Sequence, residues 1–236
     1  AKKYQIGPLF TPTVVSKVEG PYGSFRSSGG VNWPGGSYDP ETHIAYVPSF
    51  TSLLPLGLLP PPNKEFSDAA YVEGDARFGV RYIAGPGEIV PAELQLPPQS
   101  EAAGNGAAIL TGGGLNPQGL PLLKPPYGRI TAVNMDTGEI VWQVANGETP
   151  DFVRNHPALK GLNIPRTGQA GYGGAVITKT LVIAGEPLLT TTADHPRGAM
   201  LRAYDKKTGK EVGAVWMPAP QTGTPMTYSV NGKQYI

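Results

Sequence analysis

The stretch AVNMDTGEIVW at residues 132–142 has a near copy, AYDKKTGKEVG, at residues 203–213, 71 residues further along (203 − 132 = 71). In each copy a strand-like arm leads into a polar turn that contains Thr-Gly, and a second arm follows. Glycine suits such a turn because it adopts positive φ at little cost. Repetition at this distance indicates an antiparallel unit that is used more than once.

Three further segments have the pattern of β-hairpins. SYDPETHIAYVPS at 37–49 has two apolar arms around a proline-containing turn, and GGAVITKTLVIAGE at 173–186 has β-branched arms around Thr-Lys-Thr. MTYSVNGKQYI at 226–236 contains Asn231-Gly232, a strong signal for a type I′ turn. In the first hairpin His43 stands where a turn glycine is usual, so we do not expect a left-handed conformation there.

The order of these segments predicts an all-β fold built from repeated four-stranded sheets. Residues 37–49 and 129–144 are expected to form one sheet, residues 173–217 a second, and 226–236 a terminal hairpin. Four-stranded sheets repeated along a chain are the blades of a β-propeller, whose closure hides sheet edges. The sequence therefore predicts a partial β-propeller of about two blades plus a hairpin. An ordinary β-sandwich with coincidental Thr-Gly turns is the alternative.

Residues 51–126 differ in character from the rest. LPLGLLPPP, LQLPPQ, TGGGLNPQG and LLKPPYG interrupt any regular period with proline and glycine. Proline lacks the backbone N–H that a sheet ladder needs. We expect a long irregular insertion here, with at most one short strand around residues 76–84, inside a single domain that covers residues 1–236.

Composition excludes several classes of function. Charged residues make up 16% of the chain, against about 25% on average, and the net charge is +1, so nothing predicts a nucleic-acid partner. The absence of cysteine excludes disulfides and thiolate zinc sites. No apolar run approaches the ~18 residues of a membrane-spanning helix, and AKKYQIGPLF lacks the core of a signal peptide. We expect both ends of the sequence to be cut and any export signal to lie outside it.

The stretch at 132–142 closely resembles the docking motif Ala-x-Asp-x-x-Thr-Gly-x-x-x-Trp of the quinoprotein (PQQ-dependent) alcohol and glucose dehydrogenases. The hairpins at 37–49, 173–186 and 226–236 are also similar to that family. The resemblance implies an eight-bladed parent propeller that carries pyrroloquinoline quinone (PQQ) and calcium, of which this chain is the C-terminal portion. In that setting Trp142 is expected to be largely buried against the neighbouring blade.

Two departures from the motif leave questions open. Asn134 replaces the aspartate in the first copy. In the second copy Gly213 occupies the tryptophan position, and Trp216 lies three residues further on. Either that blade docks through a bulged strand, or Trp216 fills the gap in another way.

The resemblance implies a cofactor-binding role for Asn32, Trp33 and Tyr172. The Asn32 amide would donate to a quinone oxygen and favour the charge that develops there on reduction, although it could also be a turn residue before Pro34. Trp33 and Tyr172 could equally serve packing. No catalytic residue and no metal ligand is assigned, because the catalytic aspartate and the calcium ligands of the family belong to earlier blades.

Other chemistries have little support. The sequence contains no Gly-x-Ser-x-Gly elbow, and its glycine clusters complete neither a phosphate loop nor a dinucleotide fingerprint. The three histidines are scattered, which is typical of surface residues. Carboxylates such as Asp151, Asp194 and Glu186 could pair in space, so a glycosidase remains an unsupported alternative.

The function implied by the resemblance is that of a fragment of a PQQ-dependent dehydrogenase. Its substrate would be an alcohol, polyol or sugar, and its electrons would pass to membrane quinone or a cytochrome. We expect a periplasmic location, any association with the inner membrane being made through parts outside this chain, and no activity of the isolated chain. The alternative is a non-catalytic propeller of PQQ repeats that acts as a protein-binding scaffold.

Overall fold

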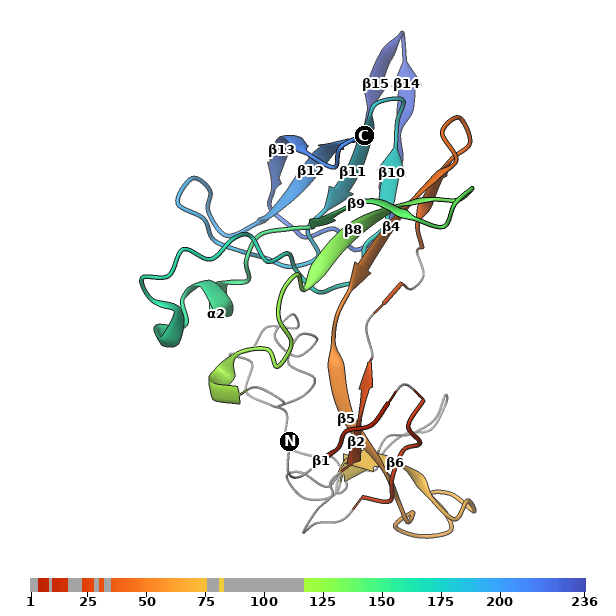
Figure 1. The fold of residues 1–236 in the computed structure, drawn as a ribbon. Helices are drawn as coiled ribbons and strands as arrows, with labels where there is room; N and C mark the ends of the chain where they lie inside the picture. Colours follow the sequence, from red (N-terminus) through yellow and green to blue (C-terminus); the bar gives the residue numbers. More distant parts are fainter. Residues whose placement is uncertain are drawn as a thin grey trace.

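Strands dominate the structure, a computed structural model that describes residues 4–8, 10–16, 23–27, 30–31, 35–75, 81–82 and 117–236 (Figure 1). One four-stranded antiparallel sheet contains, in this order, β3 (Ser37–Asp39), β4 (Ile44–Phe50), β8 (Gly128–Asn134) and β9 (Ile140–Ala145). We call it the first blade. The second blade contains β10 (Ala175–Ile177), β11 (Leu181–Gly185), β12 (Ala199–Asp205) and β13 (Glu211–Met217), also antiparallel. These are the two sheets that the sequence predicts.

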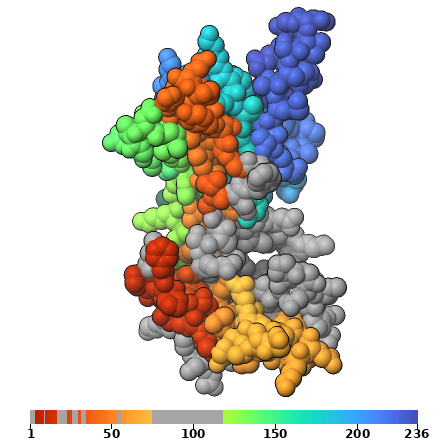
Figure 2. Space-filling view, turned by 90° about the vertical axis from the view of Figure 1, so that its right-hand side faces the viewer, coloured from red at the N-terminus to blue at the C-terminus, as the bar shows by residue number. Residues whose placement is uncertain are grey.

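A terminal hairpin of β14 (Tyr228–Val230) and β15 (Lys233–Tyr235) follows the second blade. Asn231 and Gly232 have φ of 50° and 76°, which confirms the predicted turn with two positive φ values. The hairpin, in dark blue, stands at the upper end of the molecule and is exposed throughout (Figure 2). Helical structure in the described ranges is confined to short turns: α2 (Asp151–Arg154), η2 (Pro117–Gly119) and η3 (Pro157–Leu159).

The two Thr-Gly turns are held in the same way. Oδ1 of Asn134 accepts the backbone N–H groups two and three residues later, at 2.8 and 3.1 Å. Oδ1 of Asp205 does the same at 3.1 and 2.9 Å. An amide oxygen serves as well as a carboxylate oxygen in this role, which explains why Asn134 can replace the aspartate of the motif.

The hairpin predicted at 37–49 is present, and its turn is a third copy of this arrangement. Asp39 accepts from the N–H of Glu41 at 3.2 Å and from the hydroxyl of Thr42 at 2.5 Å. His43 then takes φ of 55°, as the turn glycines do. The expectation that His43 would not be left-handed is therefore wrong. Asp39 and Thr42 impose the turn, and its geometry requires positive φ at the fifth position whatever residue stands there.

Both blades also carry the same bulge in the outer strand. Ala132 pairs with Trp142 and Val133 with Ile140, so Val141 is the extra residue. In the second blade Ala203 pairs with Gly213, and the register again shifts by one residue at the next pair. The bulge is thus a feature of the repeat.

Trp216 does not take over the docking position in the second blade. Its indole N–H donates to the carbonyl of Pro196 at 3.2 Å, and its ring covers Gly198, where an added Cβ would lie 2.2 Å from the indole nitrogen. Both contacts are with the loop that enters β12. The sequence left two possibilities open for the second blade, a bulged strand or another place for Trp216. The structure shows both: the strand is bulged as in the first blade, and Trp216 packs on the loop that enters β12 of its own blade.

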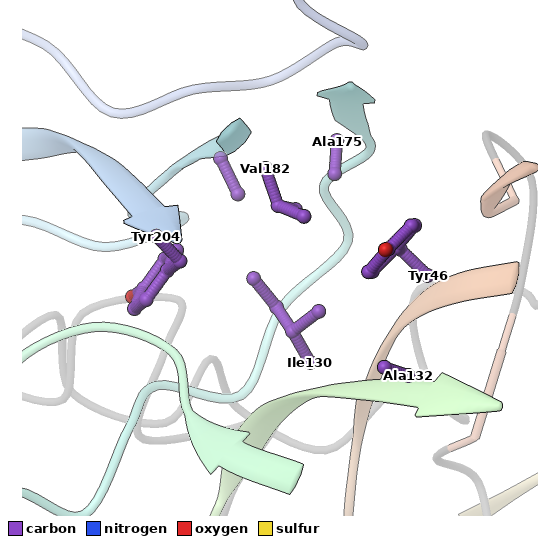
Figure 3. Close-up of a cluster of buried hydrophobic side chains, with 7 residues drawn as sticks. Tyr46, Ile130, Ala132, Ala175, Val182 and Tyr204 are labelled. Atoms are coloured by element: carbon purple, nitrogen blue, oxygen red, sulfur yellow. The ribbon is translucent and has the colours of Figure 1, made fainter. Parts of the chain in front are cut away.

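The core lies between the two blades. Tyr46, Ile130 and Ala132 of the first blade face Val182 and Tyr204 of the second (Figure 3). Ala175 and Ala184 complete this buried cluster. Removing these side chains from water stabilises the contact between neighbouring sheets. A sandwich also packs sheets face to face, but here the same turn and bulge recur in successive four-stranded units, as in propeller blades.

Trp142 packs against the edge of this core and is only partly buried, so the expectation of a largely buried ring is too strong. Its ring lies over the turn that joins β12 and β13, where a Cβ at Gly209 would come within 2.7 Å of the indole. The indole therefore contacts the second blade while staying partly accessible.

The described residues of the stretch at 51–126 contain more strands than predicted. A further sheet contains β1 (Tyr4–Gln5), β2 (Gly23–Ser27), β5 (Leu53–Leu59), β6 (Val72–Asp75) and β7 (Arg81–Tyr82), in that order. β7 falls in the expected 76–84 range, whereas β5 and β6 were not predicted. β5 tolerates Pro55 because its first half, 53–56, pairs with β2, whereas the ladder with β6 involves only 57–59, where Leu58 also bridges to Val15. The missing N–H therefore interrupts no second ladder.

In the described part of the chain, no helix has the length and the apolar character needed to cross a lipid bilayer.

Candidate cofactor site

Phe50 connects the two segments that carry the predicted cofactor-binding residues. Its carbonyl accepts the N–H of Gly30 at 2.7 Å, and its N–H donates to the carbonyl of Gly30 at 3.3 Å. Its ring lies 4.9 Å from the ring of Tyr172 in an edge-to-face arrangement, with 86° between the planes. Two segments about 140 residues apart in sequence therefore meet at the end of β4.

Tyr172 occupies an accessible position on a firmly held loop. Its side chain is 46% exposed, whereas Ala170, two residues earlier, is fully buried. Gly171 packs so closely on Pro187 that an added Cβ would lie 2.5 Å from that ring. About half of Tyr172 is therefore accessible, although the residues before it are tightly packed.

Asn32 and Trp33 lie outside the described residues. Their roles, like that of Tyr172, stay predictions. The structure describes Gly30 and Val31, which lead into them, and Val31 is exposed. Gly30 has φ of 113°, a conformation that few other residues adopt.

Gln221 is a residue of this region that sequence reasoning missed. Its side-chain oxygen accepts the N–H of Gly185 at 2.5 Å, and its amide nitrogen donates to the carbonyl of Gly174 at 2.8 Å. Gly174 must be glycine here because a Cβ would lie 2.3 Å from the hydroxyl of Thr224. Gln221, which precedes β14, therefore links the residue before β10 to the last residue of β11. Only the Gly-Gly pair in the sequence hinted at such a close approach.

Gln169 lies three residues before Tyr172, and its side-chain amide nitrogen lacks a hydrogen-bond partner among the described residues. The residue is 2% exposed, and its Oε1 accepts the N–H of Leu188 at 3.0 Å. Its Nε2 has no hydrogen-bond partner in the described part of the chain. Gln169, Arg129 and Gly173 line a small hollow between the two blades. Arg129 is itself held by the hydroxyl of Thr51 at 2.6 Å.

A buried ion network ties the loop after β9 to the second blade. Arg202 is the centre, and it is 3% exposed. Its guanidinium donates to Glu186 at 2.7 and 2.9 Å, to Glu211 at 2.9 and 3.0 Å and to Glu148 at 2.8 Å. Burial by itself lowers the pKa of Arg202, but the charge and hydrogen bonds of Glu186 and the charge of Glu211 outweigh it and raise the pKa above its usual value. Arg202 is therefore permanently charged and needs its partners.

Glu186 serves this network and has no free oxygen for acid–base chemistry. It is fully buried, and besides Arg202 it accepts the N–H groups of Glu148 at 2.8 Å and of Met200 at 3.0 Å. Asp151, a second carboxylate of the glycosidase alternative, accepts the N–H of Thr191 at 3.1 Å. Both carboxylates thus have structural roles, which the sequence could not show because their partners are distant along the chain.

Metal ligation receives no support from the residues that the structure describes, since they contain no cluster of three or more histidine or acidic side chains that could hold an ion. His43 contacts Asp136 at 3.0 Å, and His156 contacts the carbonyl of Gln118 at 2.6 Å. The location of calcium ligands outside this chain stays a prediction.

The predicted role of Tyr172 requires that its ring be accessible to a flat quinone such as PQQ. Tyr172 is 46% exposed, and Gly173 beside it has no side chain. Flat, conjugated molecules pack favourably on such a ring. The described residues would thus hold only part of such a cofactor.

Repeated four-stranded blades, docked through a tryptophan and a turn, define this chain as a segment of a β-propeller. Over residues 1–236 the sequence matches the PQQ family described as "Glucose/ethanol/alcohol dehydrogenase, beta-propeller domain". The chain belongs to this family of PQQ-dependent dehydrogenases.

Three relatives illustrate the family. The "Probable quinate dehydrogenase (quinone)" of Xanthomonas campestris pv. juglandis is 28% identical over 89% of this chain and 23% of its own length. The "Quinoprotein glucose dehydrogenase" of Gluconobacter oxydans (strain 621H) is 28% identical over 98% of this chain and 26% of its own. The "Glycerol dehydrogenase large subunit" of the same strain is 29% identical over 96% of this chain and 28% of its own length. The chain thus spans about a quarter of the length of these relatives.

Proposed function

We propose that this chain forms part of a PQQ-dependent dehydrogenase that oxidises a hydroxyl group of an alcohol, polyol or sugar. The family match over the whole chain carries the proposal. Relatives named for quinate, glucose and glycerol support a polyhydroxylated substrate class. Electrons would pass to membrane quinone or to a cytochrome; one relative is named a "1-butanol dehydrogenase (cytochrome c)".

In this proposal the chain contributes one wall of the cofactor pocket. When bound, PQQ supplies an acceptor for the two electrons that leave the substrate. Tyr172 would support the ring system, and the segment after Gly30 would bring the Asn32 amide towards its oxygens. The loop below Tyr172 keeps this wall in place through Gln169 and the packing of Gly171 on Pro187.

The remaining parts of the proposal concern the complete enzyme. Calcium would be bound by residues outside this chain, and the location would be periplasmic. The 236 residues alone would not turn over substrate, because blades outside this chain would supply the catalytic base and most of the cofactor pocket.

A chimera tests this proposal. Residues 1–236 would replace the matching quarter of the Gluconobacter oxydans glucose dehydrogenase, and PQQ binding and dye reduction would be measured with glucose, glycerol, quinate and ethanol. We expect the chimera to bind PQQ and reduce the dye, and the isolated 236-residue chain to do neither. A folded chimera that does not bind PQQ would favour the non-catalytic scaffold. Turnover by the isolated chain would show that the chemistry lies within these residues.

A further inference from the structure

We propose that Phe50 is a positioning residue for the part of the cofactor pocket that this chain contributes. Its ring sets the orientation of Tyr172, and its backbone fixes the position of Gly30. This inference rests on the proposed function. The inference goes beyond the proposed function because it assigns a role to Phe50, a buried residue.

Phe50 is buried, whereas its aromatic partner Tyr172 is half exposed. It is 3% exposed and lies in a hydrophobic cluster with Tyr127, Val153 and Ala170. The next residue, Thr51, donates its N–H to the carbonyl of Tyr127 at 2.9 Å. The end of β4 is thus anchored both by packing and by the backbone.

The backbone of Phe50 is hydrogen-bonded to the backbone of Gly30. Both of its polar groups pair with Gly30, at 2.7 and 3.3 Å. A reciprocal pair of this kind fixes distance and direction together, as in an antiparallel ladder. The reciprocal bonds therefore fix the position and direction of the described part of this segment, Gly30 and Val31, relative to Phe50.

The ring of Phe50 packs against the ring of Tyr172. At 4.9 Å between ring centroids and 86° between planes, the contact has the favoured edge-to-face geometry of aromatic pairs. Tyr172 is 46% exposed, so the protein surrounds only part of it. Loss of the Phe50 ring would allow the tyrosine to adopt other rotamers, and a ligand that needs one orientation would then bind more weakly.

The experiment measures PQQ affinity in the chimera described above, by titration of protein fluorescence with PQQ at saturating calcium, together with the melting temperature. Phe50→Leu keeps an apolar side chain and removes the ring. Val153→Ala is the matched control because Val153 belongs to the same buried cluster but lies in α2, whereas Phe50 at the end of β4 makes the contacts with Gly30 and Tyr172. Tyr172→Leu removes the half-exposed partner with little risk to folding.

We expect Phe50→Leu to raise the Kd for PQQ by about 3- to 10-fold, the size of one aromatic contact, and Val153→Ala to lower the melting temperature without changing the Kd. Tyr172→Leu should raise the Kd by a similar factor, and Phe50→Leu should add little in its presence because both act through one contact. An unchanged Kd in Phe50→Leu, or in Tyr172→Leu if Phe50→Leu does not fold, would overturn the inference. Failure of the unsubstituted chimera to bind PQQ would instead overturn the proposed function.

Discussion

The indole N–H of Trp142 donates to the main-chain carbonyl of Lys206 at 3.1 Å, and this bond joins the outer strand of the first blade to the turn of the second. The hydroxyl of Tyr46 donates to the same carbonyl at 3.2 Å. The ammonium of Lys206 meets the carboxylate of Asp39 at 2.6 Å. One residue of the second blade thus receives three side chains of the first, and the docking of the blades depends on it.

Trp142→Ala should destabilise the chain by about 3 kcal/mol, the lower end of the range for removing a large aromatic from a core, because the ring is only partly buried. Trp142→Phe keeps a ring over Gly209 but loses the bond to Lys206, so we expect a loss of about 1 kcal/mol. Urea titration measures both. The control is Trp216→Ala, whose ring packs on its own sheet and should leave the fluorescence of Trp142 unchanged. Equal losses for the alanine and phenylalanine variants would show that ring packing contributes little.

Gly209→Ala and Gly138→Ala form a matched pair. Both glycines have positive φ, 71° and 75°, so each alanine introduces backbone strain of about 1–2 kcal/mol. A Cβ at Gly209 would also lie 2.7 Å from the Trp142 ring, whereas a Cβ at Gly138 would meet nothing within 4 Å. Gly209→Ala should therefore cost a further ~1–3 kcal/mol through overpacking. The free energies of unfolding decide this, and similar values for the two variants would contradict the docking geometry.

Acid should weaken the contact of Asp39 with Lys206. Hydrogen bonds from the Lys206 ammonium and the Thr42 hydroxyl hold the pKa of Asp39 below its usual value of 3.8. A carboxyl with a lowered pKa in the folded state contributes stability above its unfolded pKa and loses it as the pH falls through the folded value. The unfolding free energy should therefore fall more steeply below pH 4 in the unsubstituted chain than in Asp39→Asn. Parallel pH curves for the two proteins, measured by urea titration, would rule out this role.

Glu186→Gln should be strongly destabilising, by about 3–5 kcal/mol, because it leaves the buried Arg202 guanidinium without its most buried counter-charge. The new amide nitrogen would also face a backbone N–H that donates to Glu186. Glu211→Gln is the control: it contacts the same guanidinium, but its side chain is 26% exposed, so we expect about 1 kcal/mol or less. Thermal unfolding compares the two. A loss at Glu186 no larger than at Glu211 would mean that water reaches the network.

Local patterns determined the blades of this protein. The turn at Asn134, its copy at Asp205 and the Asn231-Gly232 pair depend on side chains within three residues of the backbone groups that they satisfy, or on the φ preference of the residues themselves. Such interactions can be predicted from sequence because their partners are adjacent in the chain. The turn before His43 was predicted as well, and only the positive φ of His43 was not expected, because histidine replaces the glycine there.

Tertiary structure alone decided the interfaces. Arg202 and Glu148 are 54 residues apart in sequence, and Phe50 and Tyr172 are 122 residues apart. No periodicity encodes such pairs, since they depend on how two sheets pack. Likewise, Pro55 disfavoured a strand by local rules, but the strand forms because its two halves pair with different neighbours. The sequence by itself thus determined the repeated unit and the family resemblance, whereas the three-dimensional packing decided which residues join the blades and which ones support Tyr172.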